Sequence, residues 1–426
     1  MIPMADNFHH GPEIIEYEGA EGTIREVKSS VTMIVGTAPV HLVHENAEAR
    51  AAYINRRIVI RSVKDAVAAF GPNTAGFTLV AAIESIFNKT INGQGGGTVI
   101  AVNVFDPDVH QDGGQPDPAL VTAADIIGTV DTAGIYSGFQ LAYGAFNSLG
   151  YFPKVLLAPG FSTLPGVRAA MEVIANKIHA IHLDDLPLGL TVQQALEQRG
   201  TAGGYNTSSE RALLFYPHVK ALDSITGEMT LQPYSQHYAG VLVASDLAYG
   251  YHHSPSNREM ADVYGLERDI YHHAGDYQSD TNLLNGAGLI TVRNNYGSGF
   301  LTFGNRSAAF PTSTDMRNFV HARRIFDMIH ESVLYYAMEK TDRLATAVNI
   351  DIVEEDVNAF LRSKEGDGAL YGGRCTFDRT KTTKRTVADG HVFYKLELMP
   401  TGLTERLTFD SYLDLDFAKA ALGLTS

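Results

Sequence analysis

Lys154-Val-Leu-Leu-Ala-Pro-Gly160 is the stretch that decides the fold. Its apolar run stops at Pro159-Gly160, a pattern typical of a strand buried on both faces. Ala180-Ile-His-Leu183 is a second candidate strand. Apolar residues recur at helical spacing between the two runs, and the last of them lies in the second run. They are Val167, Met171, Ile174, Ile178 and Ile181. A strand, a helix and a strand at this spacing form a βαβ unit, which predicts a parallel sheet covered by helices.

Similar segments flank this unit on both sides. A helix is predicted over Ser62–Gly71, with Ser62 as the N-cap and Gly71 as the stop. A polar stretch rich in proline and glycine, 106–118, predicts a loop. The other expected strands cover 31–36, 98–104 and 212–216, and the other expected helices cover 78–87 and 235–249.

From about Asp315 the pattern changes. A long amphipathic helix is expected to run to about Lys340, and a second helix, Val353 to Lys364, follows the segment 347–352. Residues 374–377 and the alternating run 392–398 predict two strands. This part is therefore predicted to be a separate α+β domain.

The two ends of the chain each contain a short extended run. These runs, 12–18 and 405–414, are set apart from the nearest compact segment by glycine or proline. An unpaired strand is a template for pairing with another chain. Two such arms on one subunit allow head-to-tail contacts, and contacts of this kind that do not close build helical filaments. The ends therefore favour an assembly protein over an enzyme.

Composition restricts the class of protein. The 426 residues, of which 45% are hydrophobic, are enough for two or three domains. A formal charge of −15 argues against general binding of nucleic acid or of an anionic membrane. Cys375 is the single cysteine, which excludes an internal disulfide framework. We find no signal peptide and no run of about 20 apolar residues, so we expect a chain made in a reducing cytoplasm and no membrane insertion.

Two kinds of motif invite a cofactor or metal interpretation, a glycine-rich run and pairs of adjacent histidines. Gly93-Gln-Gly-Gly-Gly97 follows a helix and opens a strand, the reverse of a phosphate loop, and it is predicted to be a turn. Adjacent histidines diverge on a helix or a strand, so pairing alone favours ordinary packing over a metal site. These pairs are His9-His10, His252-His253 and His272-His273. No cofactor or metal site is expected.

A hydrolase is the alternative from another class. Ser162 occupies a strand-to-helix turn but lacks the flanking glycines of a nucleophile elbow. Asp184-Asp185 lies in a predicted polar loop, and adjacent carboxylates do not converge on one substrate. A cytoplasmic α/β hydrolase-like enzyme with an unrecognised site would be supported by hydrolysis that is lost on changing Ser162.

Cations are concentrated near the C-terminus. In so acidic a chain they could create a local positive field that docks an acidic partner, or they could be a solvated face with cations favoured at a helix C-terminus. The sequence leaves both interpretations open. The cations are Arg323, Arg324, Arg362, Lys364, Lys381, Lys384 and Arg385.

Several segments, in order along nearly the whole chain, resemble the contractile tail sheath proteins of bacteriophages and of R-type pyocins. Phe303-Gly-Asn-Arg-Ser307 resembles the element that leads into the long C-terminal helix of that family. The order and spacing of the segments carry the resemblance more than any single one. The others are 10–16, 29–39, 124–128, 154–162, 254–257 and 265–268.

The resemblance implies an α/β chain with a central subtilisin-like domain that lacks a catalytic triad. It implies an N-terminal arm (1–26), a central domain with a mostly parallel sheet (27–314), an α+β domain facing the tube (315–403) and a C-terminal arm (404–426). The outer loop, 106–122, is short, as in a sheath with little decoration. Arg362 and Lys364 are the candidates for contact with the tube. The strand residues expected to pair with neighbouring subunits are Glu13, Ile14, Ile15, Tyr17, Leu407, Phe409, Tyr412 and Leu413.

The function implied is structural. Subunits would polymerise helically around a tail tube in a metastable extended state, and contraction would drive the tube through the host envelope. The expected partners are other copies of the chain, the tail tube protein, and the baseplate and tail terminator proteins. The expected location is the virion tail. A tubular wall without contraction is a third interpretation.

Overall fold

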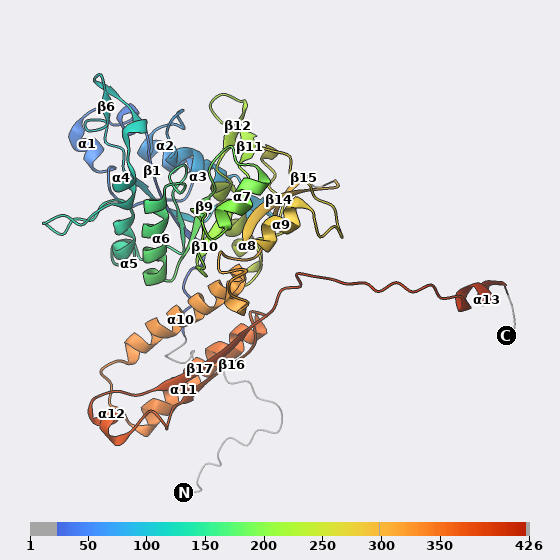
Figure 1. The fold of residues 1–426 in the computed structure, drawn as a ribbon. Helices are drawn as coiled ribbons and strands as arrows, with labels where there is room; N and C mark the ends of the chain where they lie inside the picture. The colour runs from blue at the N-terminus through green and yellow to red at the C-terminus, as the bar shows by residue number, and fades with distance from the viewer. Residues whose placement is uncertain (1–23, 298, 423–426) are drawn as a thin grey trace, which may run out of the picture.

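The structure is a computed structural model that describes residues 24–297 and 299–422. A three-layer body lies at one end of the molecule, and a slimmer C-terminal region made by α10, α11, β16 and β17 lies at the other (Figure 1). The C-terminal segment projects away from both.

An eight-stranded sheet in the order β15-β14-β10-β9-β8-β1-β5-β2 organises the body. The strands from β14 to β5 run parallel, whereas β15 and β2 lie antiparallel at the two edges. The prediction of a mostly parallel sheet is therefore confirmed. The strands are β1 (Val31–Gly36), β2 (Ile58–Ile60), β5 (Thr98–Asn103), β8 (Val155–Leu157), β9 (Ile181–Asp185), β10 (Ala212–Phe215), β14 (Leu289–Asn295) and β15 (Gly299–Phe303).

The predicted βαβ unit is β8, α6 (Pro165–Ile178) and β9. Leu156 in the middle of β8 lies between Met33 of β1 and His182 of β9, and all three residues of β8 are buried. Because side chains alternate along a strand, the sheet buries one apolar set on each face. Its two faces therefore need helical cover, as the apolar run from Lys154 predicts.

Helices cover both faces of the sheet (Figure 1). On one face pack α2 (Val63–Phe70), α3 (Leu79–Phe87) and α8 (Tyr234–Tyr249). Ser62 caps α2 by accepting from the Asp65 N–H, and Gly71 ends it, as predicted. The other face carries α4 (Ala123–Ile127), α5 (Ala145–Leu149) and α6, and farther along α7 (Val192–Arg199) and α9 (Asp280–Gly286).

The remaining elements of the body are small. The predicted glycine turn joins β3 to β4 and leads into β5. A separate sheet has the order β12-β11-β13. The bounds are α1 (Ala47–Ala51), β3 (Thr90–Ile91), β4 (Gln94–Gly95), β6 (Gln111–Asp112), β7 (Gln115–Pro116), β11 (Val219–Leu222), β12 (Met229–Gln232) and β13 (Val263–Leu266), with 3-10 turns at Val40–Leu42, Pro118–Leu120, Gly138–Gly144 and Met316–Asn318.

The C-terminal region packs two helices against a two-stranded antiparallel sheet. Its elements are α10 (Val320–Lys340), α11 (Ala347–Gly366), β16 (Leu370–Phe377), α12 (Lys384–Ala388) and β17 (Tyr394–Pro400). Two predicted helix boundaries were wrong. The long helix begins at Val320 because a 3-10 turn occupies 316–318. The second helix begins at Ala347, because the Thr346 hydroxyl accepts from the Asn349 N–H and caps it there.

Buried ion pairs hold α10 against the body. Arg324 of α10 forms a bidentate ion pair with Asp246 of α8. Lys154, which lies just before β8, pairs with Glu331 of α10. Arg211, just before β10, donates to Asp327 at 2.5 and 2.8 Å. Lys154 and Arg211 lie at the amino ends of parallel strands, so α10 crosses that edge of the sheet.

The interpretation of Arg323 and Arg324 as a docking surface was wrong. Arg324 is 5% exposed, and its guanidinium is committed to Asp246. Arg323 is also buried and pairs with Asp327 and Glu210. The pairs of Arg323 with Glu210 and of Arg324 with Asp246 hold the C-terminal region to the body, and periodicity could not reveal them because these two acidic partners are distant in sequence.

The expectation that Asp184-Asp185 forms a polar loop was also wrong. Both residues end the buried strand β9 and are at most 2% exposed. The Asp184 carboxylate lies 3.0 Å from Nδ1 of His182, and Glu172 lies 2.9 Å from Nε2. Burial lowers the pKa of His182, but the two carboxylates outweigh it and raise the pKa to about 9.

The raised pKa of His182 predicts a pH dependence of stability. A group whose pKa is raised on folding stabilises the folded state because it binds its proton more tightly there. For His182 this stabilisation is complete below the unfolded pKa of about 6.5, and it is lost as the pH rises through about 9. The free energy of unfolding of the unassembled chain should fall over this window by up to about 3 kcal/mol. His182→Gln should remove most of this dependence, measured by urea unfolding at several pH values. The exposed-site control His391→Gln should keep it, and an unchanged slope in His182→Gln would contradict the assignment.

The buried pair beneath α10 predicts a large mutational effect. Arg324→Met leaves the Asp246 carboxylate buried without its cation, and should lower the free energy of unfolding by about 3–5 kcal/mol. The control Arg317→Met removes a half-exposed pair with Asp315 and should cost at most about 1 kcal/mol. Urea unfolding of both variants measures the difference. Similar small losses in the two would show that α10 is not held by this pair.

Candidate assembly site

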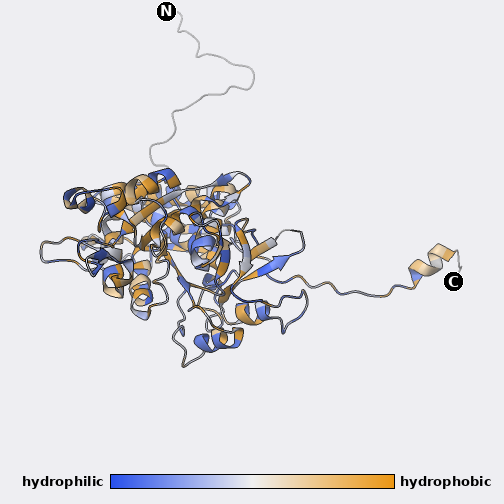
Figure 2. Ribbon diagram, turned by 90° about the horizontal axis from the view of Figure 1, so that it is seen from above, coloured by the Kyte–Doolittle hydropathy of each residue, from blue (hydrophilic) through white to orange (hydrophobic). Residues whose placement is uncertain are grey.

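The C-terminal segment pairs with no strand in the part of the chain that the structure describes. Residues 401–414 form neither helix nor strand, and α13 (Asp416–Leu422) follows them. The segment extends from the body to a helix with hydrophobic residues at its far end (Figure 2). Four of the predicted arm residues lie on it and are largely exposed: Leu407 at 73%, Phe409 at 86%, Tyr412 at 85% and Leu413 at 90%.

The sequence of this segment nevertheless alternates like a strand. Apolar side chains stand at Leu407, Phe409, Leu413 and Leu415, two or four residues apart, whereas polar residues dominate the positions between them. This period of two is typical of a strand with one buried face. The prediction that the segment pairs with a neighbouring subunit stays a prediction.

The root of the segment is anchored to the rest of the chain. The Thr401 N–H donates to the Ala369 carbonyl at 3.0 Å, and the Thr401 carbonyl lies 2.8 Å from Nε2 of His321. Arg306 then donates to both oxygens of Glu405 at 2.9 and 2.5 Å. Arg406 donates to the Tyr277 hydroxyl at 2.8 Å, and the large apolar side chains that follow it are exposed.

The entry of the N-terminal segment is anchored as well. Ile24 is 7% exposed and packs in the core of the C-terminal region, and the Val27 N–H donates to Ser332 Oγ at 3.3 Å. Glu26 accepts from Lys364 at 3.0 Å. The predicted arm residues Glu13, Ile14, Ile15 and Tyr17 lie outside the described residues.

The two predicted tube-facing cations differ in their surroundings. Lys364 is 7% exposed, and its ammonium pairs with Glu26 and, at 2.7 Å, with Asp367. Burial lowers the pKa of Lys364, but these two carboxylates outweigh it and raise the pKa. Arg362 has a side chain that is 58% exposed and pairs with the exposed Glu355. Lys364 thus anchors the N-terminal entry, and Arg362 is the cation that is accessible to a partner.

Sequence reasoning missed the residues that anchor the two terminal segments and those that bond to the β16 edge of the β16-β17 sheet. Arg306 lies in the motif that carried the family resemblance, but nothing local marked Glu405 as its partner. Glu354, Asn358 and Glu365 of α11 donate to or accept from the backbone of β16. Their spacing of four and seven residues along one helix face was the available signal.

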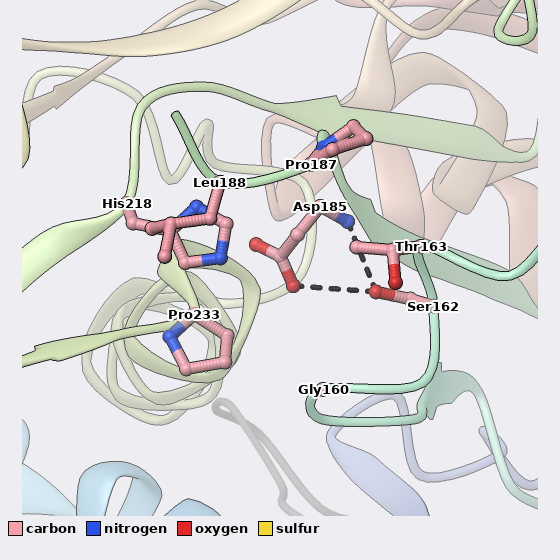
Figure 3. A pocket seen from close by; sticks show the side chains of 8 residues that line it. All are labelled: Gly160, Ser162, Thr163, Asp185, Pro187, Leu188, His218 and Pro233. Carbon is pink, nitrogen blue, oxygen red and sulfur yellow. Dashed lines mark hydrogen bonds between the residues drawn. The ribbon is translucent and has the colours of Figure 1, made fainter. Parts of the chain in front are cut away.

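A pocket of about 250 Å³ lies where an open α/β sheet usually binds ligands, just beyond the carboxyl ends of β8, β9 and β10. Figure 3 shows Ser162 turned toward Asp185, with His218 across the pocket. The Ser162 hydroxyl accepts from the Asp185 N–H at 3.1 Å and donates to its carboxylate at 3.4 Å. Asp185 also accepts from the N–H and hydroxyl of Ser235 at 2.9 and 2.5 Å, near the start of α8.

This geometry does not provide an activated nucleophile. Both hydrogen bonds of the Ser162 hydroxyl go to Asp185, whereas His218 faces Glu267 at 3.7 Å. Asp184 and Asp185 point to opposite faces of the sheet, as expected for successive residues of a strand. Burial raises the pKa of Asp185. The cluster joins β9 to α8.

The histidine pairs within the described residues pack as expected against neighbouring groups. The rings of His252 and His253 are 4.6 Å apart, and His272 lies 2.8 Å from the Thr281 hydroxyl. In the described ranges, no group of three or more acidic, histidine or cysteine side chains is placed to hold a metal ion. Each helix in these ranges is too short or too polar to cross a membrane.

Comparisons with known proteins agree with one another. A family model for the phage tail sheath central domain matches residues 121–308, and one for the phage tail sheath C-terminal domain matches 312–414. The tail sheath protein of Burkholderia phage BcepMu is 35% identical over 99% of this chain and 100% of its own length. A putative prophage major tail sheath protein of Pseudomonas aeruginosa is 27% identical over 95% of this chain and 96% of its own.

Solved structures share the fold. A sheath complex of the extracellular contractile injection system PVC, in its contracted state, has a TM-score of 0.67 and 16% identity, covering 96% of this chain and 99% of that one. The contracted helical sheath of the anti-feeding prophage has a TM-score of 0.66 and 15% identity, covering 96% and 100%. These likenesses, the two matched domains and the close relative agree: the chain belongs to the family of phage tail sheath proteins.

Proposed function

We propose that this protein is the structural subunit of a contractile phage-type tail sheath that polymerises helically around a tail tube. The observation that carries the proposal is the exposed C-terminal segment, whose sequence alternates like a strand and which is bonded to no other strand among the described residues. A strand of this kind gains its backbone hydrogen bonds only from another sheet.

The finer architecture follows the family. We assign residues 1–26 and 404–426 to terminal arms, 27–314 to a subtilisin-like central domain and 315–403 to a domain that faces the tube. The arms add strands to the C-terminal domains of neighbouring subunits. The family match to residues 312–414 begins near the proposed junction, which supports a boundary there.

Contraction is a change of packing between subunits. The extended sheath stores free energy relative to a wider and shorter sheath with more buried surface, so that no nucleotide is needed. The buried pairs beneath α10 support this mechanism, because they tie the C-terminal region to the body within each subunit. Arms joined by backbone hydrogen bonds then keep neighbouring subunits connected while whole subunits shift.

The partners follow from this role. They are other copies of the chain, a tail tube protein, a baseplate that triggers contraction and a tail terminator. The subunit is made in the cytoplasm of the host bacterium and ends in the virion tail. The fold is shared with chains in the baseplate structure of the anti-feeding prophage, which supports a contact at that end.

Removing either arm should abolish ordered tubes without unfolding the subunit. Chains that lack residues 1–22 or 404–426 lose the strands that join subunits, but the cores of the body and the C-terminal region stay complete. Negative-stain electron microscopy, with tube and baseplate added for nucleation, reports assembly, and urea unfolding reports the fold. Striated tubes from the full chain are the control. Normal tubes from either truncation would contradict that arm.

Arg362 is predicted to contribute to docking on the tube. Arg362→Glu reverses an exposed charge and should weaken assembly on the tube more than assembly without it. Lys220→Glu, on the exposed face of β11 in the body, is the control for a change of two charges. Sedimentation of sheath with and without tube measures the two reactions. Equal losses in both would reject a tube contact at Arg362.

A further inference from the structure

The β11-β12 hairpin of the body ends in an exposed apolar tip, residues 222–229. Ile225 in the turn is 47% exposed, and Leu222 and Met229, which stand opposite each other on the two strands, are 51% and 49% exposed. Glu228 is also exposed and forms no ion pair with any residue that the structure describes. The hairpin tip therefore combines an apolar surface with one available negative charge.

Hydrogen bonds hold the hairpin tip in one shape. The Asp223 carboxylate accepts from the N–H groups of Ile225 and Thr226 at 2.8 and 3.0 Å. Ser224 donates to the Glu84 carboxylate of α3 at 2.6 Å, which ties the turn to a helix of the body. A loop that is already ordered loses little conformational entropy when it binds. The tip therefore presents its apolar side chains in a fixed arrangement.

A hollow of about 570 Å³ lies between α5, the end of α6 and the second half of α10. Its wall is aromatic: the ring centroids of Phe146 and Phe152 are 3.9 Å apart, and those of Phe152 and Tyr335 are 4.9 Å apart. Leu334 and Met338 of α10 also line the hollow and are 54% and 71% exposed. Exposed apolar surface gathered in this way is typical of a site of contact with another molecule.

Lys177 supplies a positive charge to this aromatic hollow. It lies near the end of α6, is exposed, and holds its ammonium 4.3 Å from the ring centroid of Tyr143. Among the described residues, no carboxylate forms an ion pair with it. Glu331 also lines the hollow, but it is already paired with Lys154. The hollow therefore suits an apolar ligand with one negative charge, which is the composition of the hairpin tip.

The hairpin tip and the aromatic hollow lie at opposite edges of the main sheet. The hairpin follows the carboxyl end of β10, whereas the hollow lies where β8 begins, at the amino-end edge that α10 crosses. Figure 1 shows β11 and β12 at the end of the body that is far from α10. A subunit therefore cannot fill its own hollow. A contact between two copies would use a different surface on each, and such head-to-tail contacts can repeat along a helical array.

We propose that the hairpin tip of a second copy of this chain occupies the aromatic hollow beside α10. The inference rests on the proposed sheath function and names a contact between the bodies of two subunits that involves neither terminal segment. In this contact Ile225 and Met229 pack on the aromatic wall, because aliphatic and thioether groups pack favourably against aromatic rings. Glu228 pairs with Lys177, which fixes the orientation of the tip.

Cross-linking of the full chain in a Cys375→Ala background tests the contact. Ile225→Cys is combined in turn with Leu334→Cys or Met338→Cys, and the concentrated protein is treated with a short bis-maleimide. Because the contact is head-to-tail, we expect a ladder of dimers, trimers and larger species on denaturing gels. In the control, Val109→Cys replaces the cysteine of the hollow: Val109 is 71% exposed, as Met338 is, but lies at the same edge of the sheet as the hairpin. No ladder from either hollow position, or an equal ladder with Val109→Cys, would overturn the inference.

The exposed helix α13 is the competing occupant of the hollow. Phe417 of this helix is 76% exposed, and Phe417→Cys with Met338→Cys reports its contact with the hollow. We expect no ladder from this pair. A ladder from Phe417→Cys but not from Ile225→Cys would assign the hollow to the C-terminal segment and overturn the inference.

A charge exchange tests the polar part of the contact. Lys177→Glu and Glu228→Lys each bring like charges together, so each should reduce the ladder from Ile225→Cys and Met338→Cys severalfold. The chain with both exchanges has opposite charges again and should recover the ladder. Unchanged ladders in the single exchanges, or no recovery in the chain with both, would contradict the pairing of Glu228 with Lys177.

Electron microscopy of the same samples separates this inference from the proposed function. Striated tubes without a ladder would refute the contact and leave the sheath function intact. A ladder without tubes, even with tube and baseplate present, would support the contact and contradict the sheath.

Discussion

The ion pairs buried beneath α10 are the constraint on which the rest of the molecule depends. Arg324 with Asp246, Arg211 with Asp327 and Lys154 with Glu331 join one long helix to the amino-end edge of the main sheet. Removing one partner of such a pair leaves the other charge buried and uncompensated, which costs about 3–5 kcal/mol. These pairs therefore join the body and the C-terminal region of the subunit into one unit.

The two terminal segments are anchored where they leave the rest of the chain. Glu26 with Lys364 fixes one root, and Glu405 with Arg306 fixes the other. An anchored root sets the direction in which a segment leaves the subunit, and a fixed direction lowers the entropy cost of any contact that the segment makes. The pocket beyond β8, β9 and β10 is used differently. Asp185 there bonds to Ser162 and to the start of α8, so a position that often binds ligands in this class of sheet is instead part of the internal packing.

Much of the fold could be predicted from local pattern. Apolar runs such as that from Lys154 and helical spacing such as that from Val167 identified the parallel sheet and its cover, because both depend on residues near in sequence. Pairing between distant residues could not be predicted. Arg323 and Arg324 were taken for a surface because Glu210 and Asp246 lie far away in the chain. The burial of Asp185 could not be predicted, because its partners Ser162 and Ser235 lie 23 and 50 residues away in the chain.

The C-terminal segment gives every free subunit a stretch of apolar side chains that are exposed to contact with other copies. Such a molecule must be kept from pairing too early. The net charge of −15 supplies a repulsion between free subunits that acts over the Debye length, about 8 Å at physiological ionic strength. Salt shortens that distance but leaves backbone hydrogen bonds nearly unchanged. Ionic strength is therefore expected to change the rate at which free subunits polymerise more than it changes the stability of the assembled sheath.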